Sequence, residues 1–146
     1  MNRILHRAAL APLLAALLER TQPVARFFGY GIVTPRNNTL VCLPTTAGTG
    51  SEVSPHAILY DPSDRPKKAV ISPHLVPAVP LVDPQLTISA PPALTAATGI
   101  DALVHCLEAY ANRNAHPVVD LYALEGVRLI AAHLPRAVAD GGDLDA

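Results

Sequence analysis

The distribution of proline constrains this chain more than any other feature. The sequence holds 15 prolines in 146 residues, about twice the usual share, and they cluster between Pro44 and Pro92. Because proline removes a backbone donor and restricts the residue before it, this stretch is expected to form short strands and turns. After Pro92 the sequence shows helical periodicity. The pattern predicts an α/β part, residues 1–90, followed by an all-α part, residues 91–146.

The first part is predicted to contain one helix and several short strands. Residues 5–20 are rich in Ala and Leu, and a helix there would need apolar partners on several sides. The run 39–43 is typical of a buried, parallel strand. Residues 56–60 and 68–71 are expected to be strands whose polar link could close a hairpin, and 79–82 is a further short apolar run.

The second part is predicted to consist of two helices. Residues 92–112 and 118–139 both have helical periodicity, and Pro92 suits the first turn of the earlier helix. Pro135 is expected to kink or end the later one.

Composition and charge exclude several classes of function. Half of the residues are apolar, 16% are charged and the net charge is −1, so the chain is globular and lacks the charge to grip nucleic acid or an anionic membrane. The apolar run 8–18 is too short for a bilayer, which needs about 20 residues, and a buried helix suits it better than a signal peptide. Cys42 and Cys106 show no CxxC pattern and are interpreted as reduced core residues of a cytoplasmic protein.

The loop PTTAGTGSE, residues 44–52, is the first candidate binding element. Small residues let the backbone approach a ligand, and exposed N–H groups and hydroxyls can hold a phosphate or a ribose. A strand that runs into such a loop is where α/β sheets place ligands. The loop has no Gly-Lys-Ser/Thr ending and is not a Walker A loop. On composition alone, a turn of this kind is more often only a turn.

Asp101 and His105 form the second candidate. Their spacing of four places both side chains on one helix face, with Cβ atoms ~6 Å apart. A carboxylate and an imidazole so placed can bind one divalent ion such as Fe²⁺ or Zn²⁺. From spacing alone, a surface Asp–His pair or a capped core histidine is the commoner explanation. Gly99, where a helix former would be favoured by ~1 kcal/mol, indicates close approach of another group.

Taken together, these segments resemble the iron-containing (group III) alcohol dehydrogenases. The phrases PTTAGTGSE and TGxDALxHxxE are specific to that family, and their order and spacing agree with it over roughly residues 24–146. The segments that carry the resemblance are LVCLPTTAGTGSEVS (40–54), RPKKAVIS (65–72), PLVDPQLT (80–87), ALTAATGIDALVHCLEAY (93–110) and HPVVDLYALEGVRLI (116–130).

The resemblance implies a fold and a set of roles. The fold would be part of a Rossmann-like dinucleotide-binding domain followed by the first helices of a helical metal-binding domain. The cofactors would be Fe²⁺ (or Zn²⁺) and NAD or NADP, and the substrate a small alcohol or aldehyde. No catalytic side chain is assigned. The implied binding residues are Thr45, Thr46, Thr49, Lys67 (with Lys68 beside it) and Leu86 for the cofactor, and Asp101 and His105 as the first two of four metal ligands.

The chain departs from the family in length. Family members carry a Gly-rich pyrophosphate turn upstream and two more histidine ligands downstream, so this chain is expected to be a truncated form that is inactive alone and binds metal weakly. Helices without the rest of the bundle favour a homo-oligomer or association with the missing C-terminal portion. One alternative is a non-catalytic remnant that acts as a structural or interaction module. Another is a polyol dehydrogenase or dehydroquinate-synthase-like protein, which the two phrases fit less well.

Overall fold

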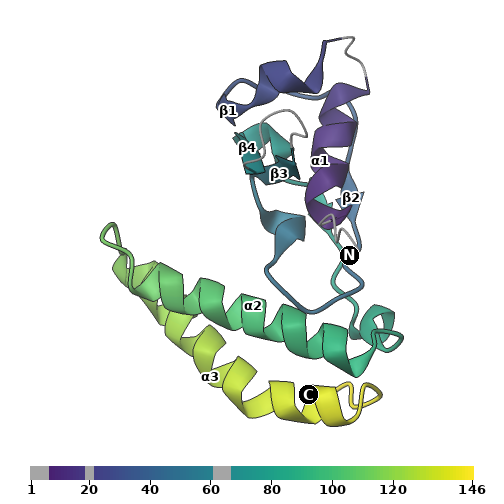
Figure 1. Cartoon of the computed structure of the whole chain (residues 1–146), viewed down its shortest axis with the longest axis vertical. Coiled ribbons are helices and arrows are strands. Elements are labelled where there is room, and N and C mark those ends of the chain that lie inside the picture. The colour runs from purple at the N-terminus through teal and green to yellow at the C-terminus, as the bar shows by residue number, and fades with distance from the viewer. Residues whose placement is uncertain (1–6, 19–21, 61–66) are drawn as a thin grey trace. The chain divides into compact units, whose positions relative to one another are not determined.

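The computed structural model describes residues 7–18, 22–60 and 67–146. Short strands and helices are interspersed up to residue 80, and two long helices occupy most of the chain from residue 92 onward (Figure 1). The α/β part followed by an all-α part, predicted from the sequence, is therefore confirmed. The elements are, in order, α1 (Arg7–Leu17), the 3₁₀ helix η1 (Val24–Phe27), β1 (Gly29–Tyr30), β2 (Val41–Cys42), η2 (Ser51–Val53), β3 (His56–Tyr60), β4 (Lys67–Ile71), η3 (Pro73–Leu75), β5 (Val79–Pro80), η4 (Pro84–Thr87), α2 (Pro92–Tyr110) and α3 (Pro117–Ala139).

Backbone contacts divide the chain into two compact units. The first unit takes the described residues of 1–43 and 51–81, and therefore holds α1 and the strands. The second, called the helical unit below, holds α2, α3 and η4 within 82–146, and also the loop 44–50. The loop that follows β2 thus belongs by its contacts to the helices and not to the strands.

The three-stranded sheet of the first unit has the order β1-β4-β3. β4 pairs parallel with β1 and antiparallel with β3, in a register that places Ile58 opposite Ala69. The expected strands at 56–60 and 68–71 are confirmed as an antiparallel pair. Their connecting segment, 61–66, lies outside the described residues.

The second sheet of the first unit is a single parallel pair, β2 with β5, in which Val41 lies opposite Val79. The prediction of a parallel strand near 39–43 is confirmed. The prediction that this strand is buried is wrong, because Val41 is 42% exposed and Leu43 is 53% exposed. A strand with one neighbour leaves its other edge and much of its surface uncovered.

α1 supplies one side of the core of the first unit. The predicted helix is confirmed over Arg7–Leu17, and the rest of 5–20, except residue 18, lies outside the described part. α1 lies against β3, where Leu13 and Ala16 are almost fully buried. The apolar face of this helix therefore finds partners on the sheet. The core cluster comprises Leu13, Ala16, Phe27, Val33, Ala57, Val70 and Leu75.

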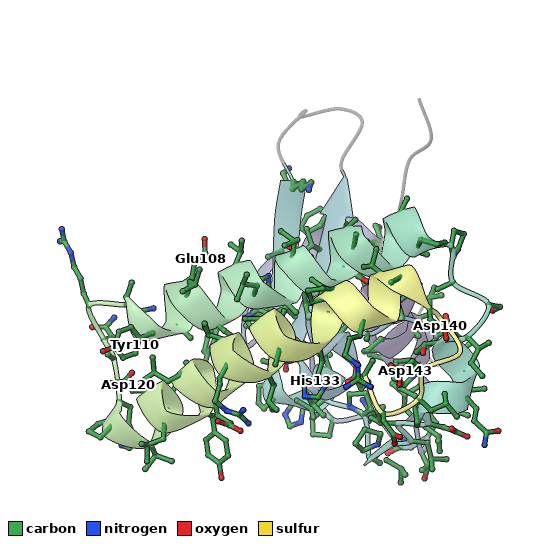
Figure 2. All side chains as sticks on the ribbon, turned by 90° about the horizontal axis from the view of Figure 1, so that it is seen from below. Glu108, Tyr110, Asp120, His133, Asp140 and Asp143 are labelled. Atoms are coloured by element: carbon green, nitrogen blue, oxygen red, sulfur yellow. The ribbon has the colours of Figure 1, made fainter. Side chains whose placement is uncertain are left out.

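α2 and α3 form a helical hairpin in which glycines permit close approach (Figures 1 and 2). A Cβ at Gly99 would collide with the Leu134 side chain of α3, and a Cβ at Gly126 would lie 2.6 Å from the Cys106 sulfur of α2. The close approach that the sequence indicated at Gly99 is therefore confirmed, and the approaching group is a leucine of the neighbouring helix.

α3 begins as predicted but does not end at Pro135. The imidazole Nδ1 of His116 accepts a hydrogen bond from the Val118 N–H at the N-terminus, and Pro117 occupies the first turn. The helix continues to Ala139, and the backbone N–H of Asp140 still bonds to the Arg136 carbonyl. Proline therefore costs one hydrogen bond here without stopping the helix, since α2 packs against this end at Gly99.

Much apolar surface of the hairpin is exposed. Leu121 is 70% and Tyr122 77% exposed, and many further large apolar side chains of α2 and α3 are more than 40% exposed. This agrees with the expectation that these two helices expose apolar faces. The exposed set includes Ile100, Val104, Leu107, Tyr110, Val118, Val119, Leu121, Tyr122, Leu124 and Leu129. No described helix is both long and apolar enough to cross a membrane.

Candidate cofactor and metal site in the helical unit

The threonine loop, Pro44–Gly50, packs against α2. A Cβ placed at Gly48 would lie 3.4 Å from the Thr98 Cβ and 3.7 Å from the Thr98 carbonyl oxygen, so this part of the loop lies close to the helix. Gly50 takes a positive φ of 68°, a conformation that favours glycine, and it turns the chain after Thr49. Thr45 is exposed, and Thr46 and Thr49 are half-buried.

Asp101 and His105 lie on the same face of α2 as the contact with the loop. Positions 98, 101 and 105 are spaced i, i+3 and i+7, which places them in one line along a helix. Asp101 is half-buried and His105 is exposed. Neither side chain makes a hydrogen bond or an ion pair with a described residue, so both keep their donor atoms for a ligand.

This face looks away from α3. Gly99 and Cys106, which contact α3, lie on the other side of α2. Glu108, seven residues after Asp101 and hence near the same face, points away from α3 in Figure 2. The metal-ligand candidates and the loop therefore share the side of α2 that α3 leaves free.

The remaining predicted cofactor residues occupy separate places. Leu86 is half-buried in η4 of the helical unit, just before the segment that leads to Pro91. Lys67 is exposed at the start of β4, in the first unit. The structure thus brings the threonines, Asp101 and His105 onto one body together with Leu86, while Lys67 belongs to the other.

The donor set fits a divalent metal but is incomplete as a tight site. A carboxylate and an imidazole suit Fe²⁺ and Zn²⁺ alike. In the part of the chain that the structure describes, no group of three or more His, Cys, Asp or Glu side chains is placed to hold a metal. Because catalytic zinc-type sites use three protein ligands and an open position, two ligands alone hold a metal weakly.

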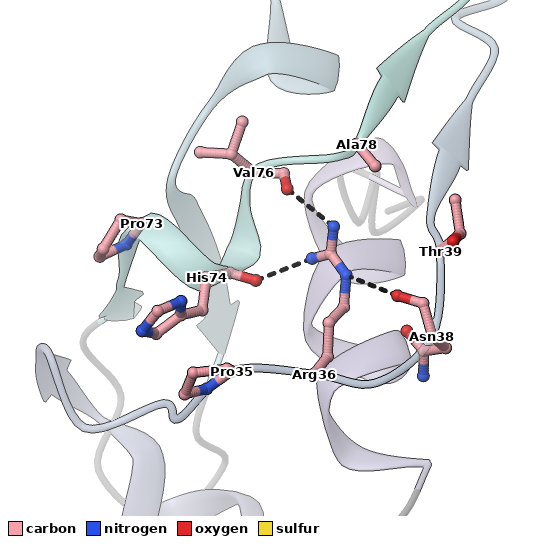
Figure 3. Close-up of a pocket in the computed structure, with 8 residues that line it drawn as sticks. All are labelled: Pro35, Arg36, Asn38, Thr39, Pro73, His74, Val76 and Ala78. Carbon is pink, nitrogen blue, oxygen red and sulfur yellow. Dashed lines mark hydrogen bonds between the residues drawn. The ribbon is translucent and has the colours of Figure 1, made fainter.

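A cavity in the first unit is lined by none of the predicted site residues. It has a volume of about 340 Å³ and is lined by Arg36, Asn38 and His74 among others (Figure 3). The Arg36 guanidinium donates to the carbonyl oxygens of His74 at 2.7 Å, Val76 at 2.8 Å and Asn38 at 3.2 Å. Arg36 therefore ties the segment before β2 to the segment after η3, and we assign it a structural role.

Cys42 lies two residues before the threonine loop. Both cysteines are free thiols, but the prediction that they are core residues is wrong, because both are only half-buried and neither belongs to the core cluster. Burial raises the pKa of the Cys42 thiol above its ordinary value; the nearby Glu52 adds to this effect and Arg36 opposes it. The protonated thiol is the form that the fold favours. The stabilisation of the folded chain by the protonated Cys42 thiol is complete at pH values below the thiol pKa of the unfolded chain. It is lost as the pH rises through the higher thiol pKa of the folded chain.

Iodoacetamide should therefore alkylate Cys42 more slowly in the folded chain than in the unfolded chain at neutral pH, since only the thiolate reacts. As the pH is raised, the alkylation rate of Cys42 should increase at a higher pH in the folded chain than in the unfolded chain. Peptide mass spectrometry can follow Cys42 separately from Cys106. A Glu52→Gln variant should shift the profile to lower pH. Identical pH profiles for folded and unfolded chain would contradict the raised pKa.

Sequence reasoning did not find the contact between Gly48 and Thr98. Gly48 was visible only as one of two glycines in a loop, and Thr98 only as a polar residue in a helix. Two residues 50 positions apart cannot be paired from a single sequence, because nothing in either segment specifies its neighbour.

The structure joins an α/β unit to a helical unit that carries the candidate loop and the candidate metal ligands, and comparison with known proteins gives the family. Residues 9–84 match the family model described as iron-containing alcohol dehydrogenase, and residues 95–146 match the Fe-containing alcohol dehydrogenase family, C-terminal. The chain belongs to the iron-containing alcohol dehydrogenase family, as the sequence resemblance indicated.

Individual relatives agree with this assignment. The chain is 45% identical over 107 residues to the NAD-dependent methanol dehydrogenase of Bacillus methanolicus, a match that covers 73% of this chain and 28% of that protein. Among solved structures, 1,3-propanediol oxidoreductase aligns with a TM-score of 0.87 and 37% identity over 94% of this chain and 36% of that one. Sulfoacetaldehyde reductase from Bifidobacterium kashiwanohense, solved in complex with NAD⁺, aligns with a TM-score of 0.84 and 31% identity over 94% of this chain and 37% of that one.

The chain thus spans about 28% of the length of the curated relative and a little over a third of the solved ones.

Proposed function

We propose that this chain is the central part of an NAD(P)-dependent, metal-dependent alcohol dehydrogenase, which transfers hydride between a small alcohol or aldehyde and a nicotinamide cofactor. The observation that carries the proposal is the packing of the threonine loop on the α2 face that holds Asp101 and His105. A nucleotide-binding loop beside two metal-ligand candidates is the arrangement that this chemistry requires. The NAD-dependent methanol dehydrogenase and the NAD⁺ complex among the relatives support it.

Each candidate residue has a role in this proposal. The hydroxyls and N–H groups of Thr45, Thr46 and Thr49 hold the phosphates and ribose of the cofactor. Lys67 offers a positive charge to the same cofactor. Leu86, at the start of the segment to Pro91, forms part of the apolar wall around the nicotinamide ribose.

Asp101 and His105 hold the metal, Fe²⁺ or Zn²⁺, together with ligands from outside the described residues. When bound, the metal supplies a Lewis acid for the substrate oxygen and the nicotinamide accepts or gives the hydride. The residues of this chain bind and orient the two groups, and orientation alone can account for several kcal/mol of a barrier, ~7 or more in favourable systems. The proposed location is the cytoplasm, where free thiols such as Cys42 and Cys106 persist.

The test is to purify the chain and titrate it with NAD⁺ and NADP⁺ by calorimetry, with and without Zn²⁺ or Fe²⁺. We expect cofactor binding and little or no alcohol-dependent formation of NADH, since two ligands do not close the site. Absence of cofactor binding with either nucleotide would count against the proposed function and favour a non-catalytic remnant. Rapid turnover would show instead that further ligands are not needed.

A further inference from the structure

Gly48 of the threonine loop lies close to Thr98 of α2, and this contact is called the seat of the loop below. A Cβ at Gly48 would lie 3.4 Å from the Thr98 Cβ and 4.0 Å from its Cγ2, which is ordinary van der Waals contact. The φ angle of Gly48 is not positive, so its backbone conformation alone does not call for glycine. A Cβ would also fit here without a clash, so the distances show that the loop lies close to α2 rather than that this position requires glycine.

The threonine contributes shape rather than a hydrogen bond. Its hydroxyl donates back along the helix to the carbonyl oxygens of Leu94 at 3.0 Å and Thr95 at 3.3 Å. With the hydroxyl used in this way, the Cβ and the Cγ2 methyl group are the side-chain atoms of Thr98 that lie nearest to the Gly48 Cβ position. A valine could present the same surface, whereas an alanine could not.

The position of Thr98 on α2 gives this contact its significance. Thr98 lies one turn before Asp101 and two turns before His105 on the same face. The next residue, Gly99, is buried against Leu134 of α3. At these two neighbouring residues, α2 thus packs against α3 on one side and lies next to the loop on the other.

Resting on the proposed function, we infer that Thr98 is a positioning residue that seats the nucleotide-binding loop 44–50 on the metal-ligand helix. The spacing between the loop and the two metal-ligand candidates is then set within the helical unit and does not depend on the strands of the first unit. This assigns the orientation of the cofactor loop to the helical unit and not to the strand from which the loop emerges.

A cross-linking experiment tests the seat directly. The 3.4 Å separation of the two Cβ positions is close to the roughly 3.5–4.5 Å that a disulfide spans. A Gly48→Cys/Thr98→Cys variant, with Cys42→Ser and Cys106→Ala to remove the native thiols, should therefore oxidise readily. The matched control is Gly48→Cys/Ala97→Cys, since Ala97 is exposed and lies one position round the helix. Equal cross-linking of both pairs would overturn the proposal.

The cross-linked chain should still bind ADP-ribose, with an affinity within about twofold of its reduced form, because the loop does not leave the helix when it binds. A loss of tenfold or more on oxidation, by an order-of-magnitude criterion, would show that the loop must move away, and would overturn the proposal. If the reduced chain fails to bind ADP-ribose at all, the proposed function fails, while the cross-linking yield still decides whether the seat exists.

Substitutions of Thr98 separate positioning from general structural support. Thr98→Val should bind ADP-ribose within about twofold of the parent, and Thr98→Ala should bind roughly threefold to tenfold more weakly. Co²⁺ affinity, which reports on Asp101 and His105, should stay within about twofold in both variants. A parallel loss of Co²⁺ and ADP-ribose binding in Thr98→Ala would indicate a disturbed helix and contradict the positioning role.

Discussion

Replacement of Asp101 or His105 by alanine should lower the affinity of the chain for Co²⁺, used as a probe of the divalent site, by roughly 10- to 100-fold or more. Losses of that size follow the removal of groups that only support a ligand, and removal of a ligand itself should cost at least as much. Each variant would keep a single protein donor, which cannot fix a metal geometry. The measurement is a Co²⁺ titration followed by visible absorbance.

The matched controls remove the same types of group elsewhere. Glu125→Ala deletes a carboxylate from the exposed ion pair with Arg128 on α3, and His74→Ala deletes an exposed imidazole from the first unit. Both should leave Co²⁺ binding within about twofold. Unchanged Co²⁺ binding in Asp101→Ala and His105→Ala would remove the assignment of these two residues.

The sequence could predict the type of each element but not the way elements share contacts. Strands 56–60 and 68–71 and the two long helices follow from alternation, helical periodicity and proline placement, which are local properties of the chain. The burial of a strand is not local, and the exposure of Val41 shows this, because its burial requires neighbours on both edges and both faces. Whether Pro135 ends the helix or only lies within it is not local either, and the structure shows that α3 continues past Pro135 to Ala139.

The candidate site divides in the same way. Asp101 and His105 could be placed on one helix face from their spacing alone. The threonine loop could be named a candidate binding element from its residues, but only the family resemblance favoured this over an ordinary turn. The position of the loop on this face, one turn before Asp101, depends on the contact between Gly48 and Thr98. This contact joins two distant segments, and the periodicity of residues within one segment gives no information about it.

Replacement of Gly99 by valine should lower the free energy of unfolding of the α2–α3 hairpin by roughly 2–4 kcal/mol. A Cβ at this position collides with the Leu134 side chain, and its approach to the Leu134 Cγ, at 3.2 Å, is also tight. Leu134 would have to leave its place, because three of its atoms, and not only its tip, face Gly99. The helix propensity that glycine lacks, ~1 kcal/mol relative to alanine, is too small to offset this overlap. Urea denaturation followed by circular dichroism at helical wavelengths measures the change.

Ala97→Val is the matched control for this prediction. It adds the same branched side chain type to the same helix at an exposed position, and should cost less than about 1 kcal/mol through propensity alone. The double variant Gly99→Val/Leu134→Ala should lose less than the sum of its two single changes, since the second makes room for the first. Additive losses would mean that the Gly99–Leu134 contact is not the cause.

The assignment of the loop 44–50 to the helical unit has a topological consequence. The backbone leaves the first unit after Leu43, returns at Ser51 and leaves again after Leu81, so three covalent tethers join the two bodies instead of one. A single protease cut at any one of these tethers would leave the halves linked through the others. Two domains joined by a single linker would separate after one such cut, whereas these two bodies stay covalently connected.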